Sequence, residues 1–304
     1  MKNASLNIIY CISFMIIIPI VMYLYIGNIK TKTTIEETHY ISVYNTKNKK
    51  ISMMSLEEYV WRATAKEMPS TFEDEAIKAQ AVAIRTYAIR KIGASIPEHN
   101  GADVCTDFGH CTAFLSEDEE NKQNKLALSK YKVLTEETKN QIITFENEPI
   151  LAVFHSISSG TTEKSSDVWS SQLPYLTNTN SELDKNVKGY HSCASFRQTE
   201  LEEHFPKTTD NNIKIISRTD GGSVKNIEIF GNLYTGQEVR NALKLRSANF
   251  TVKKDANTYI FDVVGYGHGV GMSQHGANEY AKKGMSYIDI LKKYYPTTTI
   301  TKIN

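Results

Sequence analysis

The feature that most constrains this chain is a long stretch without charge near its start. From Leu6 to Gly27 the sequence contains no Asp, Glu, Lys or Arg, and its centre, Phe14 to Met22, is apolar throughout. A helix of about 20 such residues matches the thickness of one bilayer, and the single proline in this centre is tolerated in membrane helices. The sequence therefore predicts an N-terminal transmembrane helix within residues 1–29.

Two other interpretations of the stretch remain open. A cleaved signal peptide would need a small-x-small cleavage pattern, which does not follow the run. A buried helix of a soluble domain would rarely be this long and uncharged. Lysines flank both ends, at Lys2, Lys30 and Lys32, so the positive-inside rule does not fix the orientation. Residues 30–38 are polar and are expected to form a linker, and residues 39–304 one folded domain.

The composition of the chain excludes one class of partner. With 35 Lys and Arg against 34 Asp and Glu, the formal net charge is +1. Bulk electrostatic binding of nucleic acid usually needs a strong basic excess, so no nucleic-acid partner is expected. Hydrophobic residues make up 40 % and charged residues 23 %, a composition typical of a folded domain.

Helix and strand signals alternate irregularly after the linker. Ser55 followed by Glu58 forms a capping-box pattern, and a second cap is expected at Ser70, before an alanine-rich helix. The predicted helices span residues 55–67, 72–92, 117–130, 273–283 and 286–295. The predicted strands span residues 142–145, 150–154, 213–218, 224–230 and 259–264. Without a regular βαβ order, we expect an α+β fold of mixed helices and antiparallel strands.

Glu67 is the most unusual carboxylate in the sequence. It continues the apolar face of the first predicted helix, on which Tyr59 and Ala63 also lie. It also stands at the C-terminal end of that helix, where the macrodipole disfavours negative charge. Burial and the dipole both raise the pKa of a carboxyl group, and a raised pKa suits a general acid. The alternative is a solvated glutamate just beyond the end of the apolar face.

Two cysteines and two histidines cluster between residues 99 and 111. Two Cys and two His in a short loop can form a tetrahedral zinc site, and the ligands would be His99, Cys105, His110 and Cys111. The alternative is a Cys105–Cys111 disulfide, which suits an extracytoplasmic domain. Because the chain has no His-Glu-x-x-His motif, a zincin is disfavoured. The prediction is one structural zinc ion, with His191 or Cys193 as substitutes for His110.

Two further stretches contain many polar or glycine residues. His155 to Gly160 is rich in hydroxyls and follows a predicted strand, but it lacks the spacing of a nucleophile elbow. Gly265 to Gly276 is rich in glycine and lies between a strand and a helix, but it fails the dinucleotide and phosphate-loop patterns. The first stretch is a candidate for binding a polar ligand, and the glycines of the second allow close backbone approach and unusual φ angles around His268. For both stretches, ordinary turns are the alternative.

Several blocks of the sequence, taken together, are similar to one known family. They are Glu67–Pro69, Glu75–Ala83, Arg85–Ala88, His155–Glu163, Trp169, Pro174–Leu176, Leu245–Phe250 and Gly267–Ala277. In content and order they resemble the stage II sporulation protein D family. The resemblance covers roughly residues 42 to 295, and a single membrane anchor before the domain is usual in that family.

The resemblance implies a peptidoglycan lytic transglycosylase, whose fold is unlike that of lysozyme. Such an enzyme cleaves the MurNAc–GlcNAc β-1,4 bond and leaves 1,6-anhydroMurNAc ends. By this resemblance Glu67 is the catalytic acid. The residues that align with the glycan cleft are Arg85, Tyr87, His155, Ser156, Ser159, Arg246, His268, Ser273 and Gln274. A glycoside hydrolase normally needs two carboxylates, whereas a transglycosylase can work with one, because the C6 hydroxyl of the sugar is the nucleophile.

The resemblance also implies a setting and partners. The domain would act outside the cytoplasm, in the septal space of the mother cell, during engulfment of the forespore. Its partners would be peptidoglycan strands, the membrane, the amidase sporulation protein P and the scaffold sporulation protein M. Two other functions remain open, a non-catalytic glycan-binding module that activates a partner amidase and a zinc hydrolase.

Overall fold

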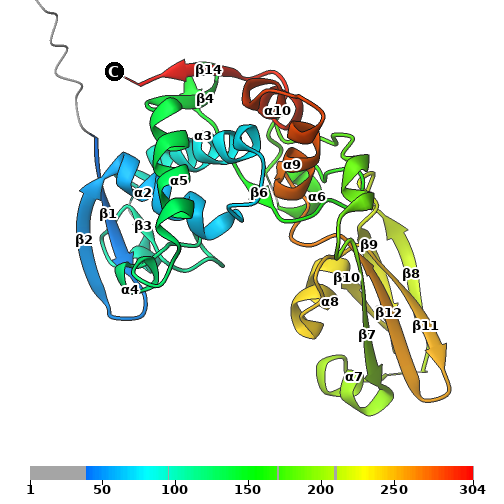
Figure 1. The fold of residues 1–304 in the computed structure, drawn as a ribbon. Helices are drawn as coiled ribbons and strands as arrows, with labels where there is room; N and C mark the ends of the chain where they lie inside the picture. Colours follow the sequence, from blue (N-terminus) through cyan, green and yellow to red (C-terminus); the bar gives the residue numbers. More distant parts are fainter. Residues whose placement is uncertain (1–38, 95, 170, 209–210, 304) are drawn as a thin grey trace, which may run out of the picture. The chain divides into compact units, whose positions relative to one another are not determined.

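The computed structural model describes residues 39–303 except 95, 170, 209 and 210, and His39–Ile303 form one compact unit. Figure 1 shows this unit as a ribbon. The predicted anchor (residues 1–29) and linker (30–38) lie outside the described residues. Within the described part, no helix has the length and apolar character needed to cross a bilayer.

The main core is built around the helix α3 (Asp74–Lys91). Its alanines, among them Ala76, Ala79 and Ala83, are completely buried. Their small side chains allow close approach by α2 (Leu56–Glu67), α5 (Lys125–Glu137), α9 (Gln274–Lys282) and α10 (Tyr287–Tyr294). Because these helices cover α3 on nearly all sides, it is stable although its sequence has only a weak amphipathic pattern.

Small sheets surround these helices. One has the order β2-β1-β3, formed by β1 (Tyr40–Asn45), β2 (Lys50–Ser55) and β3 (Val104–Cys105). Another has the order β14-β4-β5, formed by β4 (Gln141–Phe145), β5 (Glu148–Pro149) and β14 (Thr299–Lys302). The short strands β6 (Phe154–His155) and β13 (Met272–Ser273) pair in parallel and so bring the two polar stretches of the sequence together.

Residues 191–264 form what we call the inserted subdomain. It contains β7 (His191–Arg197), α7 (Gln198–His204), β8 (Ile213–Arg218), β9 (Val224–Ile229), β10 (Asn232–Thr235), α8 (Gly236–Leu243), β11 (Phe250–Asp255) and β12 (Thr258–Val264). Two antiparallel sheets, of order β10-β9-β8 and β11-β12-β7, and the two helices enclose a separate core that includes Phe230, Phe250 and Phe261. Because β7 pairs with β12, the chain enters and leaves this subdomain through neighbouring strands (Figure 1).

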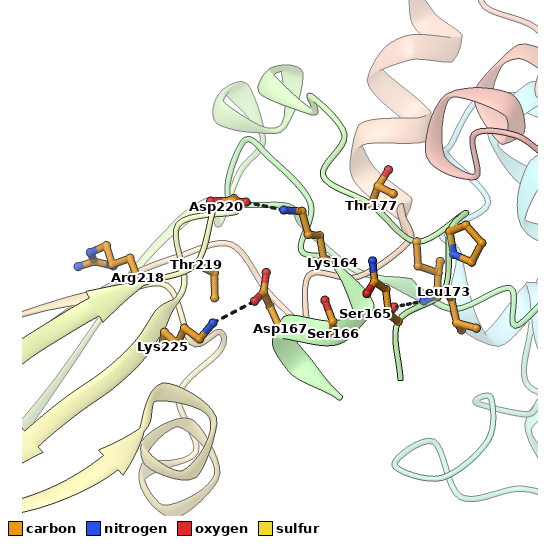
Figure 2. Close-up of a pocket in the computed structure, with 13 residues that line it drawn as sticks. Lys164, Ser165, Ser166, Asp167, Leu173, Thr177, Arg218, Thr219, Asp220 and Lys225 are labelled. Carbon is orange, nitrogen blue, oxygen red and sulfur yellow. Dashed lines mark hydrogen bonds and ion pairs between the residues drawn. The ribbon is translucent and has the colours of Figure 1, made fainter. Parts of the chain in front are cut away.

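The turn between β8 and β9 joins the inserted subdomain to the segment after β6. Figure 2 shows two ion pairs there, Lys164 with Asp220 and Lys225 with Asp167, at the edges of a pocket of about 350 Å³. The buried Glu163 adds a third contact, since its Oε1 accepts a hydrogen bond from the Ser223 backbone N–H at 3.1 Å. The pocket is lined by none of the residues predicted to bind glycan.

The predicted elements are largely confirmed, and the α+β class is confirmed by mixed helices and antiparallel sheets. Ser55 is the N-cap of α2 as predicted, although the Glu58 side chain pairs with Arg62 instead of completing the box. The cap predicted at Ser70 is wrong. The N-cap of α3 is Glu73, because a hydrogen bond from Phe72 N–H to the Pro69 carbonyl folds residues 69–72 into a turn.

Two other predictions need correction. The single helix predicted over residues 117–130 is split into α4 (Glu117–Glu120) and α5, because Asn124 starts a new helix by accepting from the Leu126 N–H. The strand predicted over residues 150–154 exists only at its end, as β6. The preceding residues are held by other contacts, among them the Tyr175 hydroxyl, which accepts from the Leu151 N–H at 3.1 Å. The remaining short helices are η1 (Pro97–His99), α6 (Ser165–Val168) and η2 (Glu182–Asn186).

Candidate functional site

Glu67 is the last residue of α2, and its half-buried carboxylate is held by two donors. Oε1 accepts from the Ala113 backbone N–H at 2.7 Å, and Oε2 accepts from the Gln274 side-chain amide at 3.1 Å. Burial raises the pKa of the Glu67 carboxyl, and the two hydrogen bonds oppose this without reversing it. The result is a fixed carboxyl group with an enhanced tendency to hold a proton.

Gln274 reaches Glu67 because two stretches of the chain that are distant in sequence pair beside it. Ser273 pairs with His155 in the β6–β13 ladder, and the His275 N–H donates to the Ser156 carbonyl at 3.0 Å. Gly271 permits this approach, since it has a φ of +71° and a Cβ there would collide with the Val153 carbonyl. The glycine-rich stretch therefore serves to place the first residue of α9 at Glu67.

A buried carboxylate that the sequence did not point to stabilises this arrangement. Asp184 is fully buried and accepts from the hydroxyls of Ser273 and Ser181, each at 2.6 Å, and from the Ser158 N–H at 3.0 Å. Ser273 is also the N-cap of α9, and it accepts from the Gly276 N–H at 3.1 Å. Burial raises the pKa of Asp184 to about 6. A single Asp in the short helix η2 gave no sequence pattern by which this role could have been predicted.

His155, His268 and Trp169 form a second group, next to the β6–β13 pair. The ring centres of His155 and His268 are 5.7 Å apart, and Trp169 lies 5.1 Å from His268. Burial lowers the pKa of His155 to about 3 and that of His268 to about 4, with the charge of Arg240 acting in the same direction on both. Both rings are therefore neutral at neutral pH, and the buried Nε2 of His155 has no hydrogen-bond partner among the described residues.

Arg85, predicted to bind glycan, lies in a different place. Its side chain is fully buried and forms a bidentate ion pair with Glu57, with N···O distances of 2.8 and 2.6 Å. It also donates to the carbonyls of Thr135 and Gln141, each at 3.2 Å. In this structure the guanidinium joins α2, α3, α5 and β4, and a glycan has no access to it.

Three other predicted contact residues use their polar groups within the protein. The Tyr87 hydroxyl donates to the His110 carbonyl at 3.2 Å, and the Ser159 hydroxyl donates to the Gly221 carbonyl of the inserted subdomain at 3.3 Å. Ser273 is completely buried as the cap of α9. Of the predicted set, Gln274 contacts Glu67 directly, whereas His155, His268 and Arg246 gather farther along the glycine-rich stretch.

The four predicted metal ligands come together in the loop after α3. One donor atom from each of His99, Cys105, His110 and Cys111 lies within 4.8 Å of all the others. His99 Nε2 is 3.1 Å from Cys111 Sγ and 3.2 Å from His110 Nδ1, and the latter is 3.6 Å from Cys105 Sγ. Ligand bonds of about 2.0–2.3 Å in a tetrahedron require separations of this size, so the donor set fits zinc. Cys105 and Cys111 are not joined by a disulfide.

The loop that carries the four candidate metal ligands also contacts Glu67. Ala113, whose N–H donates to Glu67, follows Cys111 by two residues. Between them, the hydroxyl of Thr112 is hydrogen-bonded at 2.7 Å to that of the fully buried Tyr59. The order of this loop therefore decides whether the Ala113 N–H faces the carboxylate, a backbone role that side-chain patterns cannot predict.

Comparisons with known proteins identify the family of this chain. A family model described as Stage II sporulation protein matches residues 44–145. Stage II sporulation protein D of Bacillus subtilis is 37 % identical over 270 residues, which cover 86 % of this chain and 79 % of that protein. The protein of the same name from Bacillus amyloliquefaciens is 35 % identical over 270 residues, with 86 % and 78 % covered.

The chain belongs to the stage II sporulation protein D family. The amidase enhancer of Bacillus subtilis is also similar, with 29 % identity over 292 residues that cover 77 % of this chain and 39 % of that protein. Membership in the stage II sporulation protein D family connects this chain with sporulation and with remodelling of the cell wall, which is consistent with an enzyme that acts on glycan.

Proposed function

We propose that this chain is a lytic transglycosylase that cleaves the MurNAc–GlcNAc β-1,4 bond of peptidoglycan and leaves 1,6-anhydroMurNAc ends. The observation that carries the proposal is Glu67, a half-buried carboxyl group with a raised pKa, held by the Ala113 N–H and the Gln274 amide. A carboxyl group of this kind suits general acid catalysis near neutral pH.

In the proposed reaction, Glu67 acts first as acid and then as base. The protonated carboxyl gives its proton to the bridging glycosidic oxygen as that bond breaks, and positive charge develops at C1 of MurNAc. The carboxylate then accepts the proton of the C6 hydroxyl while that oxygen bonds to C1 and closes the anhydro ring. The proton returns to Glu67, so the cycle needs neither water nor a second carboxylate.

The surroundings of Glu67 support a mechanism with one carboxylate. Its two oxygens contact donors, and no other carboxylate is among the groups that shift its pKa. We propose that the glycan extends from Glu67 along Ser156 and the glycine-rich stretch toward His155, His268 and Arg246. The neutral imidazole of His268, which lies beside the buried His155, and the exposed aromatic rings along this path suit the hydroxyls and apolar faces of sugars.

The test of this proposal is Glu67→Gln compared with Glu117→Gln, an exposed acidic residue of α4. Loss of general acid catalysis is expected to lower the release of anhydromuropeptides by roughly 10²–10⁴-fold or more, while pull-down on purified peptidoglycan stays intact. The Glu117 variant should release them at the wild-type rate. Release close to wild type by Glu67→Gln would falsify the catalytic role.

A non-catalytic function is the second candidate, because one relative is named an amidase enhancer. A glycan-binding module that activates an amidase would also need the path beside Glu67. Muropeptide analysis after digestion separates the functions: a transglycosylase produces anhydro ends, a binding module alone changes nothing, and a zinc hydrolase releases peptides.

We further propose one structural zinc ion per chain, held by the cluster of His99, Cys105, His110 and Cys111. Burial raises the pKa of the Cys105 thiol to about 11, so a thiolate there needs a nearby cation. A bound zinc ion would supply that charge and fix the loop. Four protein ligands would leave no position for a reacting water, so the chemistry remains with Glu67. Elemental analysis of the purified protein tests this, and a zinc-free active protein overturns it.

We propose that residues 1–29 anchor the protein in the mother-cell membrane with the domain outside the cytoplasm. There it would meet septal peptidoglycan and the sporulation proteins P and M, an amidase and a scaffold. The uncharged stretch from Leu6 to Gly27 and a substrate found only outside support this arrangement. Protease added to intact protoplasts should remove the domain, and full protection would contradict the proposed topology.

A further inference from the structure

Two arginines differ from all the others in this chain. Five of the seven donate to carboxylates or carbonyls, namely Arg62, Arg85, Arg90, Arg197 and Arg218. Arg240 and Arg246 are both only half-exposed, yet neither guanidinium group makes a hydrogen bond or ion pair with any residue that the structure describes. The Nε of Arg246 is buried without a partner. A partly desolvated cation without a counter-charge is unfavourable unless a ligand completes it.

The Arg246 guanidinium lies over one exposed aromatic ring. The Arg246 guanidinium carbon is 4.3 Å from the ring centre of Tyr266, whose exposed fraction is 46 %. It also packs against Gly189, where a Cβ would lie 3.2 Å from Nη1. The Tyr266 hydroxyl is also close enough to Arg240 to affect its pKa, which burial lowers. Tyr266 therefore lies within reach of two positive charges from the inserted subdomain.

No carboxylate of the described residues forms an ion pair with Arg240 or Arg246. The histidines nearest Arg240, His155 and His268, are neutral at neutral pH. The buried carboxylate of Glu163 forms no ion pair and is directed to the Ser223 N–H. The positive charge is thus left uncompensated beside two exposed aromatic surfaces, Tyr266 and Trp169, the second with an exposed fraction of 38 %.

The glycine-rich stretch connects this place with Gln274, which donates to Glu67. The Arg246 carbonyl accepts from the Gly267 N–H at 2.9 Å, in the same glycine-rich stretch that ends at Gln274. The charge of Arg246 also contributes to lowering the pKa of His275, which follows Gln274 in the chain. The path proposed for the glycan, from Glu67 along this stretch toward Arg246, would bring a strand to this place.

We propose that Arg240 and Arg246 bind a carboxylate group carried by the glycan strand, with Tyr266 and Trp169 packing against its sugars. Guanidinium groups match carboxylates in geometry and form charge-assisted hydrogen bonds with them. This inference rests on the proposed function, which supplies a strand as the substrate. Two carboxylates are available on such a strand, the lactyl group of a MurNAc residue without its peptide and the carboxylates of an attached peptide.

The experiment measures strand binding in a Glu67→Gln background, so that cleavage does not interfere. Arg240→Gln, Arg246→Gln and the double substitution are compared with Arg218→Gln, an exposed arginine whose partners are carbonyls. The probes are peptide-free glycan strands, strands with their peptides, and an N-acetylglucosamine oligomer, which has no carboxylate. Because neither guanidinium group makes a hydrogen bond or ion pair with the described residues, and Arg246 only packs on Tyr266 and Gly189, the midpoint of thermal unfolding should change little.

Each arginine substitution should weaken binding to the carboxylate-bearing strands by roughly ten- to a hundredfold, and Arg218→Gln should not. Binding of the neutral oligomer should be equal in all variants. Loss on peptide-free strands identifies the lactyl group, and loss only on peptide-bearing strands identifies the peptide. Equal loss on the neutral oligomer, or no loss on any strand, overturns this inference alone. Absence of strand binding by the parent protein overturns the proposed function together with it.

Discussion

Replacement of Gln274 by Leu tests how the protonation of Glu67 is set. Leu approximates the size of Gln in this buried position but removes the amide that donates to Glu67 Oε2 at 3.1 Å. A hydrogen bond to a charged group contributes about 1.5–3 kcal/mol, and it favours the ionised carboxylate. Since about 1.4 kcal/mol is a factor of ten, the ratio of protonated to ionised Glu67 should rise roughly ten- to a hundredfold at a given pH.

The assay is the pH dependence of kcat/KM for the release of anhydromuropeptides. Activity that needs protonated Glu67 falls as the pH rises through its pKa, so the descending limb of the profile should move to higher pH in Gln274→Leu. Lys283→Ala, at the other end of α9, is the matched control and should leave the limb in place. A folded Leu variant whose descending limb coincides with that of the wild type would refute the reasoning.

Three more outcomes are expected. Burial raises the pKa of Asp184 to about 6, so the folded state keeps a proton that the unfolded state loses, and stability falls as the pH rises from about 4 to 6. In Asp184→Asn, this fall in the free energy of unfolding should be smaller by roughly 3 kcal/mol, which urea unfolding at pH 4 and pH 6 measures. A variant whose stability depends on pH as strongly as that of the wild type would contradict this. Chelation of zinc should release the loop that presents Ala113 to Glu67, so activity should fall and return with added zinc; full activity of metal-free protein contradicts this. Arg85→Ala leaves the Glu57 carboxylate unpaired and should lower the free energy of unfolding by about 3–5 kcal/mol. Normal stability together with lost glycan binding would instead support the predicted role of Arg85 in binding glycan.

The sequence predicted the elements whose signals are local. The N-cap at Ser55, the apolar face that ends at Glu67 and the strands at residues 213–218 and 224–229 all depend on neighbours within a few positions. The strand predicted over residues 150–154 failed because its partners lie far away. The Leu151 N–H is bound by a tyrosine hydroxyl, and residues 154–155 pair with residues 272–273. A hydrophobic run alone does not show which of these contacts it will make.

In the candidate site, too, the features that depend on nearby residues could be predicted and those that depend on distant contacts could not. The unusual position of Glu67 in its helix could be inferred from periodicity, and the four clustered Cys and His residues from spacing. The donor from Ala113 is a backbone group, and the role of Asp184 depends on three loops that meet only in the folded chain. For Arg85 the residue type alone was misleading. Arginine often binds carbohydrate, but here the side chain is completely buried and forms an internal ion pair.

The neighbouring ends of the inserted subdomain have a consequence for how this chain tolerates rearrangement. The Gly265 N–H donates to the Tyr190 carbonyl at 2.8 Å, so only a short gap separates the points at which the chain leaves and rejoins the main core. The entropic penalty of closing such a loop grows only slowly with its length, and residues 191–264 have their own hydrophobic core. A tight turn in their place would span the gap, and Glu67 and its two donors all come from the main core. The contact that such a replacement must restore is the one between the Arg246 carbonyl and the Gly267 N–H, which holds the glycine-rich stretch that ends near Gln274.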